Sequence, residues 1–278
     1  MSSRHKTAFV IAHFHVNGRV PLNTHALVAE MAKYTDSIVF VSTNLQENES
    51  NLLKKYAIVI QRENIGYDFW SYKLGIDKLG DLSRFDRIVI CNTSFICLNP
   101  KFLVQNFTSE ILEVGVRSIS KSYENSEHLQ SYWLSFEGNL LLTSPEFRSW
   151  WSQLVPLDQR QKNIDLYEIG LSTYFLKLGY SLNALFKIES EHLLMIFCRA
   201  VVCGIFNISC INSNELFTID SSIARNLNPT IYAWDYLLDA TGVVKLEQLK
   251  FNYAKLDTVS KLSTLDEPSI LLIQDALK

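Results

Sequence analysis

The chain has 278 residues, of which 47% are hydrophobic and 20% are charged, and its formal net charge is −3. This length and composition suit one large folded domain, or one domain with an appendage, and they exclude a disordered tail. A near-neutral chain without a basic stripe also argues against a nucleic-acid-binding protein that works by releasing counterions.

The compartment and the relation to a membrane follow from three features. The cysteines are odd in number and lack the two-residue spacing of zinc or redox motifs, so we expect buried free thiols in a reducing compartment. The N-terminus has no small-residue cleavage site after its short apolar run, so we expect no signal peptide and a cytoplasmic protein. Residues 193–211 are apolar, but Arg199 near their middle favours a buried or interfacial helix over a membrane span. The cysteines are Cys91, Cys97, Cys198, Cys203 and Cys210.

The first third of the chain alternates between predicted strands and helices. Four Val/Ile-rich runs, at 8–12, 37–41, 57–61 and 87–91, are apolar on both faces, as in strands of a parallel sheet that is covered on both sides. The amphipathic stretch 23–34 predicts a helix, with Asn23 or Thr24 as its cap. This alternation predicts a Rossmann-like α/β domain, in which ligands bind beyond the carboxyl ends of the strands. His13, Asn64–Asp68 and Asn92–Ser94 follow those strand ends directly.

Later elements are predicted from shorter patterns. Strands are expected at 114–119 and 131–136, and helices at 144–154, capped by Ser144, and at 164–180, ending at Gly179. From about residue 191 the pattern becomes helical. We therefore expect an α/β core over residues 1–190 and a helical C-terminal extension over residues 191–278, packed on that core.

The stretch QRENIGYDFWSYKLG (61–75) supports two interpretations. In the first, Gly66 forms a turn, Asp68 caps a helix that ends at Gly80, and the aromatic rings enter the core. In the second, the turn and the helix N-terminus bind a diphosphate or ribose hydroxyls, which would give Arg62 and Asn64 a role. The spacing does not decide between them.

Three further motifs carry candidate chemistry. CNTS (91–94) closes the fourth strand, where a sugar-nucleotide enzyme often places an acidic metal ligand, but Asn92 and Thr93 are neutral. Glu168 opens a predicted helix, either as a general base or as a solvated carboxylate that the helix dipole favours. His13 and His15, with His128, lack the spacing of a zinc site, so we expect hydrogen-bonding roles for them.

These stretches together resemble the rhamnan synthesis F family of bacterial polysaccharide glycosyltransferases. The most specific matches are RENIGYDF within 62–69 and HLQS within 128–131. Further matches, in the same order as in the family, are VIAHFHVNGRV (10–20), IVICNTSFICLNP (88–100), YEIGLSTYFLKLGY (167–180) and NPTIYAWDYLL…VVKLEQLKFN (228–252).

The resemblance implies a nucleotide-diphospho-sugar transferase core of the GT-A type. Its donor would be dTDP-L-rhamnose and its acceptor a lipid-linked saccharide, in the synthesis of O-antigen lipopolysaccharide, capsule or wall polysaccharide. It would work with other polysaccharide synthesis enzymes, in the cytoplasm, peripheral at the inner face of the membrane. We expect no nucleic-acid partner. The apolar 193–211 region, with Lys187 and Arg225, would contact the membrane.

The resemblance also implies site residues. A β-linked donor that yields an α-rhamnoside implies inversion, and therefore one carboxylate base, Glu168 or, as the alternative, Asp68. The expected donor contacts are His13, Arg62, Asn64, Gly66, Asp68, Lys73, Asn92, Thr93 and Ser94. The expected acceptor contacts are His128, Gln130, Tyr132 and Trp133.

The chain departs from the family at Thr93, where the family's Asn-Asp-Ser triplet has its acid. The sequence therefore assigns no metal ligands and leaves open whether Mg²⁺ or Mn²⁺ is required, with Asp68 and Glu63 as remaining candidates. Without that acid, the leaving diphosphate would need Arg62, Lys73, a histidine or helix N-terminal amides. The rival expectation is a catalytically impaired sugar-nucleotide-binding or scaffold protein.

Overall fold

A seven-stranded sheet forms the centre of the molecule, with strand order β10-β6-β9-β4-β1-β2-β3. The computed structural model describes residues 6–202, 228–252 and 258–278. All neighbouring strands of this sheet run parallel except β9, which lies antiparallel between β4 and β6. The strands are β1 (Thr7–His13), β2 (Ile38–Ser42), β3 (Ile58–Gln61), β4 (Arg87–Asn92), β6 (Gly115–Ser118), β9 (Trp133–Glu137) and β10 (Ser181–Ala184).

Helices cover both faces of the sheet, because alternate residues of the central strands enter two separate apolar clusters. One face of β1 buries Phe9 and Ile11 beneath α1 (Leu22–Met31) and α4 (Pro100–Asn106). The other face buries Val10 beneath α3 (Tyr67–Leu79). Gly75 allows α3 to lie this close, since a Cβ there would stand 2.1 Å from the Val10 Cγ1 atom. The same face also carries α5 (Asn139–Thr143), α6 (Pro145–Gln153) and α8 (Gly170–Lys177).

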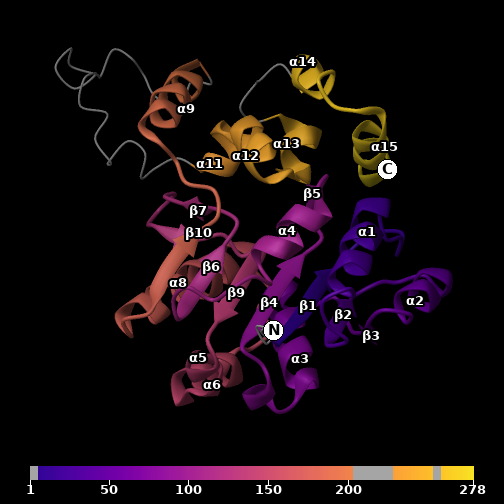
Figure 1. Ribbon diagram of the computed structural model, residues 1–278, viewed down its shortest axis with the longest axis vertical. Coiled ribbons are helices and arrows are strands. Elements are labelled where there is room, and N and C mark those ends of the chain that lie inside the picture. The colour runs from indigo at the N-terminus through magenta and orange to yellow at the C-terminus, as the bar shows by residue number, and fades with distance from the viewer. Residues whose placement is uncertain (1–5, 203–227, 253–257) are drawn as a thin grey trace.

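The C-terminal part of the chain is mostly helical and gathers at the upper end of the sheet in Figure 1. It also adds the short strand β11 (Val243–Lys245), which pairs antiparallel with β5 (Phe95–Cys97). Its helices are α9 (Ser190–Val202), α11 (Pro229–Tyr232), α12 (Trp234–Thr241), α13 (Leu246–Phe251), α14 (Thr258–Leu262) and α15 (Glu267–Ala276). The division into domains at residue 190 stays a prediction.

The remaining elements are short. They are α2 (Glu47–Leu53), the 3₁₀ turn η1 (Leu82–Arg84), β7 (Lys121–Ser122), β8 (His128–Leu129), α7 (Arg160–Asn163) and the π-helical turn η2 (Ile164–Ile169). Helices α7, η2 and α8 follow one another without a break.

The predicted Rossmann-like α/β fold is confirmed, as are the six predicted strands and the Ser144 cap, whose hydroxyl accepts a hydrogen bond from the Phe147 amide. The prediction that all four early strands are covered on both sides is wrong for β3. This strand lies at the edge of the sheet, and its Ile58 is 48% exposed. The predicted cap of the first helix is also wrong. Pro21 holds the cap position of α1, and Asn23 and Thr24 are buried inside the helix.

The prediction of buried thiols holds for Cys91 and Cys97, while Cys198 on α9 is exposed. Cys203 and Cys210 lie outside the described residues. The apolar segment 193–211 is described only to residue 202. There Arg199 forms a bidentate ion pair with Asp235 of α12, at 2.7 and 2.8 Å. In the part of the chain that the structure describes, no helix has both the length and the apolar character to cross a bilayer.

Candidate active site

A small cavity of about 160 Å³ opens at the carboxyl end of β4, beside the switch point between β1 and β4 where ligands bind in such sheets. Four separate segments of the chain line it. They are the start of α3 (Tyr67–Phe69), the strand end at Asn92 and Ser94, the helical stretch from Arg160 to Glu168, and the β11–α13 corner at Lys245 and Glu247. Ser131, before β9, completes the wall.

A chain of hydrogen bonds connects the polar groups on one side of this cavity. The Asn92 side-chain amide donates to the Asp68 carboxylate at 2.7 Å, and the Asn92 oxygen accepts from the Ser94 amide and hydroxyl. The Lys245 ammonium donates to the Ser94 hydroxyl at 3.3 Å. Asp68 is therefore not the helix cap that the sequence suggested: Gly66 occupies that position with φ +71°, and the Asp68 side chain turns to the cavity.

Glu168 faces the same cavity from the opposite wall. One carboxylate oxygen accepts a hydrogen bond of 2.7 Å from the Ser131 amide, which fixes the side chain. The sequence predicted Glu168 at the start of a helix, and this placement is wrong. It lies inside the continuous helical stretch from α7 to α8, within the π-helical turn η2. Such turns within helices are frequent at functional sites.

Burial changes the pKa values of two charged groups here. It raises the pKa of Asp68, against the opposing effect of the hydrogen bond from Asn92 and the charge of Lys245. It lowers the pKa of Lys245, although the charges of Glu168, Glu247 and Asp68 act in the other direction. Perturbed titratable groups that face each other in a cleft are typical of functional sites.

Two larger pockets adjoin this cavity. One, of about 470 Å³, shares Arg160, Ile164, Glu168, Lys245 and Glu247 with it, and its other lining residues are mostly polar. That pocket also contains His128 and Gln130, as well as Asn228. The other, of about 400 Å³, is lined by Asn64–Tyr67 and Pro156–Asp158, and Tyr67 connects it to the cavity.

The turn that contains Arg62 is held together by that arginine. Its guanidinium donates to the carbonyl oxygens of Glu63, Ile65 and Tyr67 and, through two nitrogens, to the Ser71 hydroxyl. These bonds use all five N–H groups of the side chain. Arg62 thus stabilises its own turn and does not line the cavity, and its role as a donor contact stays a prediction.

His13 and Lys73 also bond to residues outside the cavity. The His13 ring bonds to the Ser42 hydroxyl at 2.8 Å and to the Arg19 carbonyl at 3.0 Å, and burial lowers the pKa of His13 to about 4. Lys73 pairs with Asp77, one turn further from the helix N-terminus, at 3.1 Å. Neither residue lines the cavity.

The predicted acceptor contacts fall into two groups. His128 and Gln130 line the 470 Å³ pocket, and the Gln130 amide donates to Asn228 and Thr230. Tyr132 and Trp133 are buried in the core instead, at 1% and 0% exposure, so neither ring presents a face to solvent. The Tyr132 ring lies 4.5 Å from the Lys245 nitrogen.

Residues of the CNTS motif differ in orientation. Asn92 and Ser94 line the cavity, whereas the backbone amide of Thr93 bonds to the Ala12 carbonyl at 3.1 Å. Within the described ranges, no three His, Cys, Asp or Glu side chains are grouped in a way that suits a metal ion.

Sequence reasoning missed Lys245, Ser131 and Arg160. Lys245 lies in the VVKLEQLK stretch, where one cation ends an apolar strand, and this was the signal available in the sequence.

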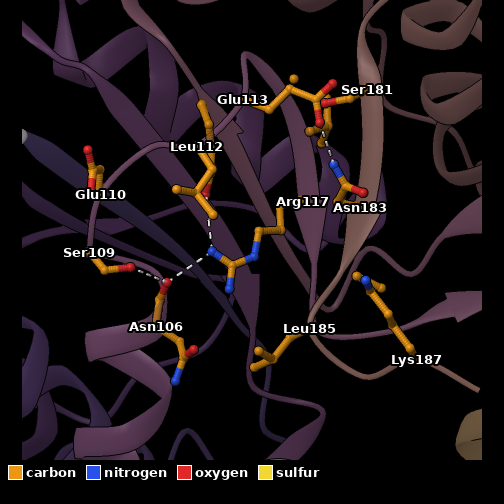
Figure 2. Close-up of a pocket in the computed structure, with 14 residues that line it drawn as sticks. Asn106, Ser109, Glu110, Leu112, Glu113, Arg117, Ser181, Asn183, Leu185 and Lys187 are labelled. Carbon is orange, nitrogen blue, oxygen red and sulfur yellow. Dashed lines mark hydrogen bonds and ion pairs between the residues drawn. The ribbon is translucent and has the colours of Figure 1, made fainter.

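A separate pocket of about 440 Å³ lies between α4, β6 and β10 (Figure 2) and shares no lining residue with the cavity. Its polar groups bond to each other: Arg117 donates to the Asn106 carbonyl, and Asn183 donates to Glu113. We therefore do not assign the chemistry to this pocket.

Comparison with known proteins gives distant structural and closer sequence similarities. GlyE of Streptococcus pneumoniae TIGR4, a glycosyltransferase, matches 93% of this chain and 62% of its own, at 15% identity and a TM-score of 0.37. Mouse xyloside xylosyltransferase 1 matches 63% and 82%, at 13% identity and a TM-score of 0.34. These likenesses are too distant to indicate an activity.

Two curated bacterial proteins are similar in sequence. Virulence protein VirA of Vibrio anguillarum is 29% identical over 195 residues, which cover 67% of this chain and 60% of VirA. Protein y4gN of Sinorhizobium fredii is 26% identical over 166 residues, which cover 57% of this chain and 43% of y4gN. The chain thus matches only part of the length of each. A profile described as rhamnan synthesis protein F matches residues 38–200. The chain belongs to the rhamnan synthesis protein F family.

Proposed function

We propose that the chain is an inverting glycosyltransferase of bacterial polysaccharide synthesis, with Glu168 as the general base. The observation that supports this most strongly is the position of Glu168. Its carboxylate is fixed by the Ser131 amide and lines both the small cavity and the 470 Å³ pocket beside it. A base must lie where the bound donor and the entering acceptor meet, and Glu168 is on that boundary.

The three adjoining pockets suggest how the substrates are arranged. The nucleotide lies against Asn64 and Gly66, the sugar and diphosphate enter the small cavity near Asp68 and Asn92, and the acceptor enters the pocket of His128 and Gln130. The family supports L-rhamnose from dTDP-L-rhamnose as the transferred sugar and a lipid-linked saccharide as the acceptor.

The reaction is a single displacement. An acceptor hydroxyl gives its proton to Glu168 as its oxygen bonds to the anomeric carbon of the sugar. The bond from that carbon to the diphosphate oxygen breaks, and its electron pair leaves with the nucleoside diphosphate. Asp68, whose carboxylate Asn92 orients, is placed to accept hydrogen bonds from the sugar hydroxyls.

Contact with a membrane is a second part of the proposal, since a lipid-linked acceptor lies at the inner membrane face. Leu194 and Met195 on α9 are 54% and 41% exposed and offer an apolar contact. Vesicles with anionic lipid should retain the protein in a flotation assay, and Leu194→Ser with Met195→Ser should reduce that retention. Equal retention of the wild type and the double variant would show that Leu194 and Met195 of α9 do not bind the membrane.

The experiment that tests the enzyme is a panel of nucleotide sugars. Unfolding temperatures with dTDP-, UDP- and GDP-sugars identify the donor, because a ligand that binds the folded state raises its apparent stability. Release of nucleoside diphosphate, with and without a saccharide acceptor, then measures turnover. Binding without turnover would favour the rival, a sugar-nucleotide-binding protein, and absence of both would contradict the proposal.

A further inference from the structure

Lys245 enters the candidate site from a distant part of the sequence. It ends β11, where it pairs with Phe95 of β5, directly after the Asn92–Ser94 turn. Val243 and Val244 are fully buried and hold the strand in place, so the lysine position is fixed by the backbone. Its ammonium lies 3.3 Å from the Ser94 hydroxyl and 4.5 Å from the centre of the Tyr132 ring.

The groups around Lys245 do not fit a divalent cation. The Asn92 oxygen already accepts two hydrogen bonds from Ser94, and Thr93 takes the place of the family's acid. Mg²⁺ and Mn²⁺ need several free oxygen ligands, of which carboxylates are the strongest. Asp68 and Glu168 line the same cavity, but Asn92 bonds to the first and the Ser131 amide to the second, and the described residues hold no group of three acidic, His or Cys side chains that suits a metal. An ammonium bonded to Ser94 also repels a divalent cation at this strand end.

Other cations near the site already have partners. The Arg62 guanidinium donates its hydrogen bonds within its own turn, Lys73 pairs with Asp77, and Arg160 pairs with Glu247 at 3.1 Å. By contrast, no carboxylate of the described residues lies within ion-pairing distance of Lys245. Within those residues, its ammonium contacts one neutral hydroxyl and the face of one ring.

A partly buried ammonium with one neutral hydrogen-bond partner is costly, because it has given up much of its hydration while Asp68, Glu168 and Glu247 act on it without forming an ion pair. An ammonium has three N–H donors, and the described residues accept a hydrogen bond from one of them. An anionic group that binds in the cavity would supply the missing charge. Under the proposed function, that group is the diphosphate of the donor.

We propose that Lys245 is a catalytic residue that contacts the donor diphosphate, so that transfer needs no divalent metal. This inference rests on the proposed transferase activity. As the bond between the anomeric carbon and the diphosphate oxygen breaks, negative charge grows on that oxygen, and the ammonium stabilises it. The acceptor proton still goes to Glu168, and Lys245 keeps its own protons throughout.

The test uses the full chain, the donor found by the panel, and two variants. Lys245→Met keeps the aliphatic stem on Tyr132 but removes the charge, and Lys245→Arg keeps the charge. The matched control is Lys250→Met, on the exposed side of α13. Transfer and donor hydrolysis are measured in EDTA and again with added Mg²⁺ or Mn²⁺. Calorimetry in EDTA measures the binding of the nucleoside diphosphate and of the free nucleoside.

We expect EDTA to leave wild-type turnover unchanged, and Lys245→Met to lower kcat on the order of a hundred- to a thousand-fold. That variant should also bind the nucleoside diphosphate at least ten-fold more weakly, with unchanged nucleoside binding and a melting temperature no lower than that of wild type. Lys245→Arg should recover part of both losses, and Lys250→Met should behave as wild type. A purely structural role for Lys245 would lower the melting temperature and would not separate the two ligands.

Two results would overturn the inference while the transferase proposal stands. One is wild-type turnover that EDTA abolishes and Mn²⁺ restores. The other is a Lys245→Met variant with wild-type kcat and wild-type affinity for the diphosphate. If the wild-type protein neither binds nor turns over any nucleotide sugar, the proposed function fails and the inference fails with it.

Discussion

Polar residues near the cavity divide into those that line it and those that support the backbone around it. Asp68, Asn92 and Glu168 belong to the first group. His13 and Arg62 belong to the second, since their polar atoms are bonded within the protein. Residue type and position along the chain did not separate the two groups. Whether a side chain lines the cavity or bonds within the protein depends on the residues that lie beside it in the folded structure.

The buried His13 makes stability depend on pH. Burial lowers the pKa of His13 from 6.5 to about 4, so between these values the unfolded chain binds the proton more readily than the folded protein does. The free energy of unfolding should therefore fall as the pH drops through this range, by up to about 1.4 kcal/mol per pH unit from this residue.

Replacement of His13 by Gln removes this titration. Urea unfolding at several pH values between 7 and 4.5 should show a shallower loss of stability for His13→Gln than for wild type, whatever the absolute stability of the variant. Parallel curves for the two proteins would show that His13 titrates in the folded state as it does in the unfolded chain.

Among the helices, α3 shows most clearly what the sequence could predict. Gly66 and Gly80 mark its two ends as expected, with φ angles of +71° and +74°. The choice between a capped core helix and a binding turn was not decidable from spacing, and the structure supports parts of both. Phe69 and Tyr72 are buried in the core, while Asp68 faces the cavity because Asn92, from another strand, bonds to it.

The two glycines that bound α3 differ in backbone conformation and in surroundings. Gly66 has φ +71° and ψ +14°, in the left-handed region where alanine costs about 1–2 kcal/mol, whereas Gly80, with φ +74° and ψ −117°, lies outside that region. At Gly66 a Cβ would also lie 2.8 Å from the Pro156 Cα and 2.7 Å from the Trp70 Cβ, whereas at Gly80 it meets no atom within 4 Å.

We therefore expect Gly66→Ala to lower the free energy of unfolding by about 3 kcal/mol, from backbone strain and the approach of Pro156 and Trp70 together. Gly66→Ala should also weaken nucleotide-sugar binding, because the turn lines the pocket proposed for the nucleotide. Chemical unfolding and calorimetry measure the two effects. A loss of only about 1 kcal/mol, the size of the backbone strain alone, would contradict the close approach of Pro156 to this turn.

In the whole molecule, the C-terminal part is joined to the sheet by specific contacts rather than by apolar packing alone. Arg19 donates to the Asp275 carboxylate at 2.6 Å and to its carbonyl oxygen, and the Leu22 amide donates to the same carboxylate at 2.7 Å. These bonds hold α15 beside α1 (Figure 1). Strand β11 joins β5 in the same region and so places Lys245 in the cavity.

The sequence predicted the α/β core well because Val/Ile-rich strands and amphipathic helices are local patterns. It did not predict Lys245 as a site residue, because the pairing of β11 with β5 joins segments about 150 residues apart, and a cation at the end of an apolar strand does not indicate which site it enters. The sequence named Glu168 as a candidate base but did not predict its bond to Ser131, which depends on how α7, η2 and α8 lie against β9.

The Asp275 contact can be tested with a matched control. Asp275→Asn should lower the free energy of unfolding by about 2 kcal/mol, because it removes a partly buried ion pair and weakens the bond to Leu22. Asp239→Asn, which breaks the exposed pair with Lys261, should cost less than about 0.5 kcal/mol. Similar costs for both variants would show that α15 contributes little to stability through Asp275.

The most direct test of the account compares turnover and donor binding in Glu168→Gln. The Gln side chain can still accept the Ser131 hydrogen bond, so the site keeps its shape while the base is lost. The control is Asp165→Asn, an exposed carboxylate in the same helical turn that bonds to Gln161 and does not line the cavity. We predict that Glu168→Gln binds the nucleotide sugar as wild type does but transfers the sugar on the order of a hundred- to ten-thousand-fold more slowly, with Asp165→Asn unchanged. Wild-type transfer by Glu168→Gln would contradict the assignment of Glu168 as the base.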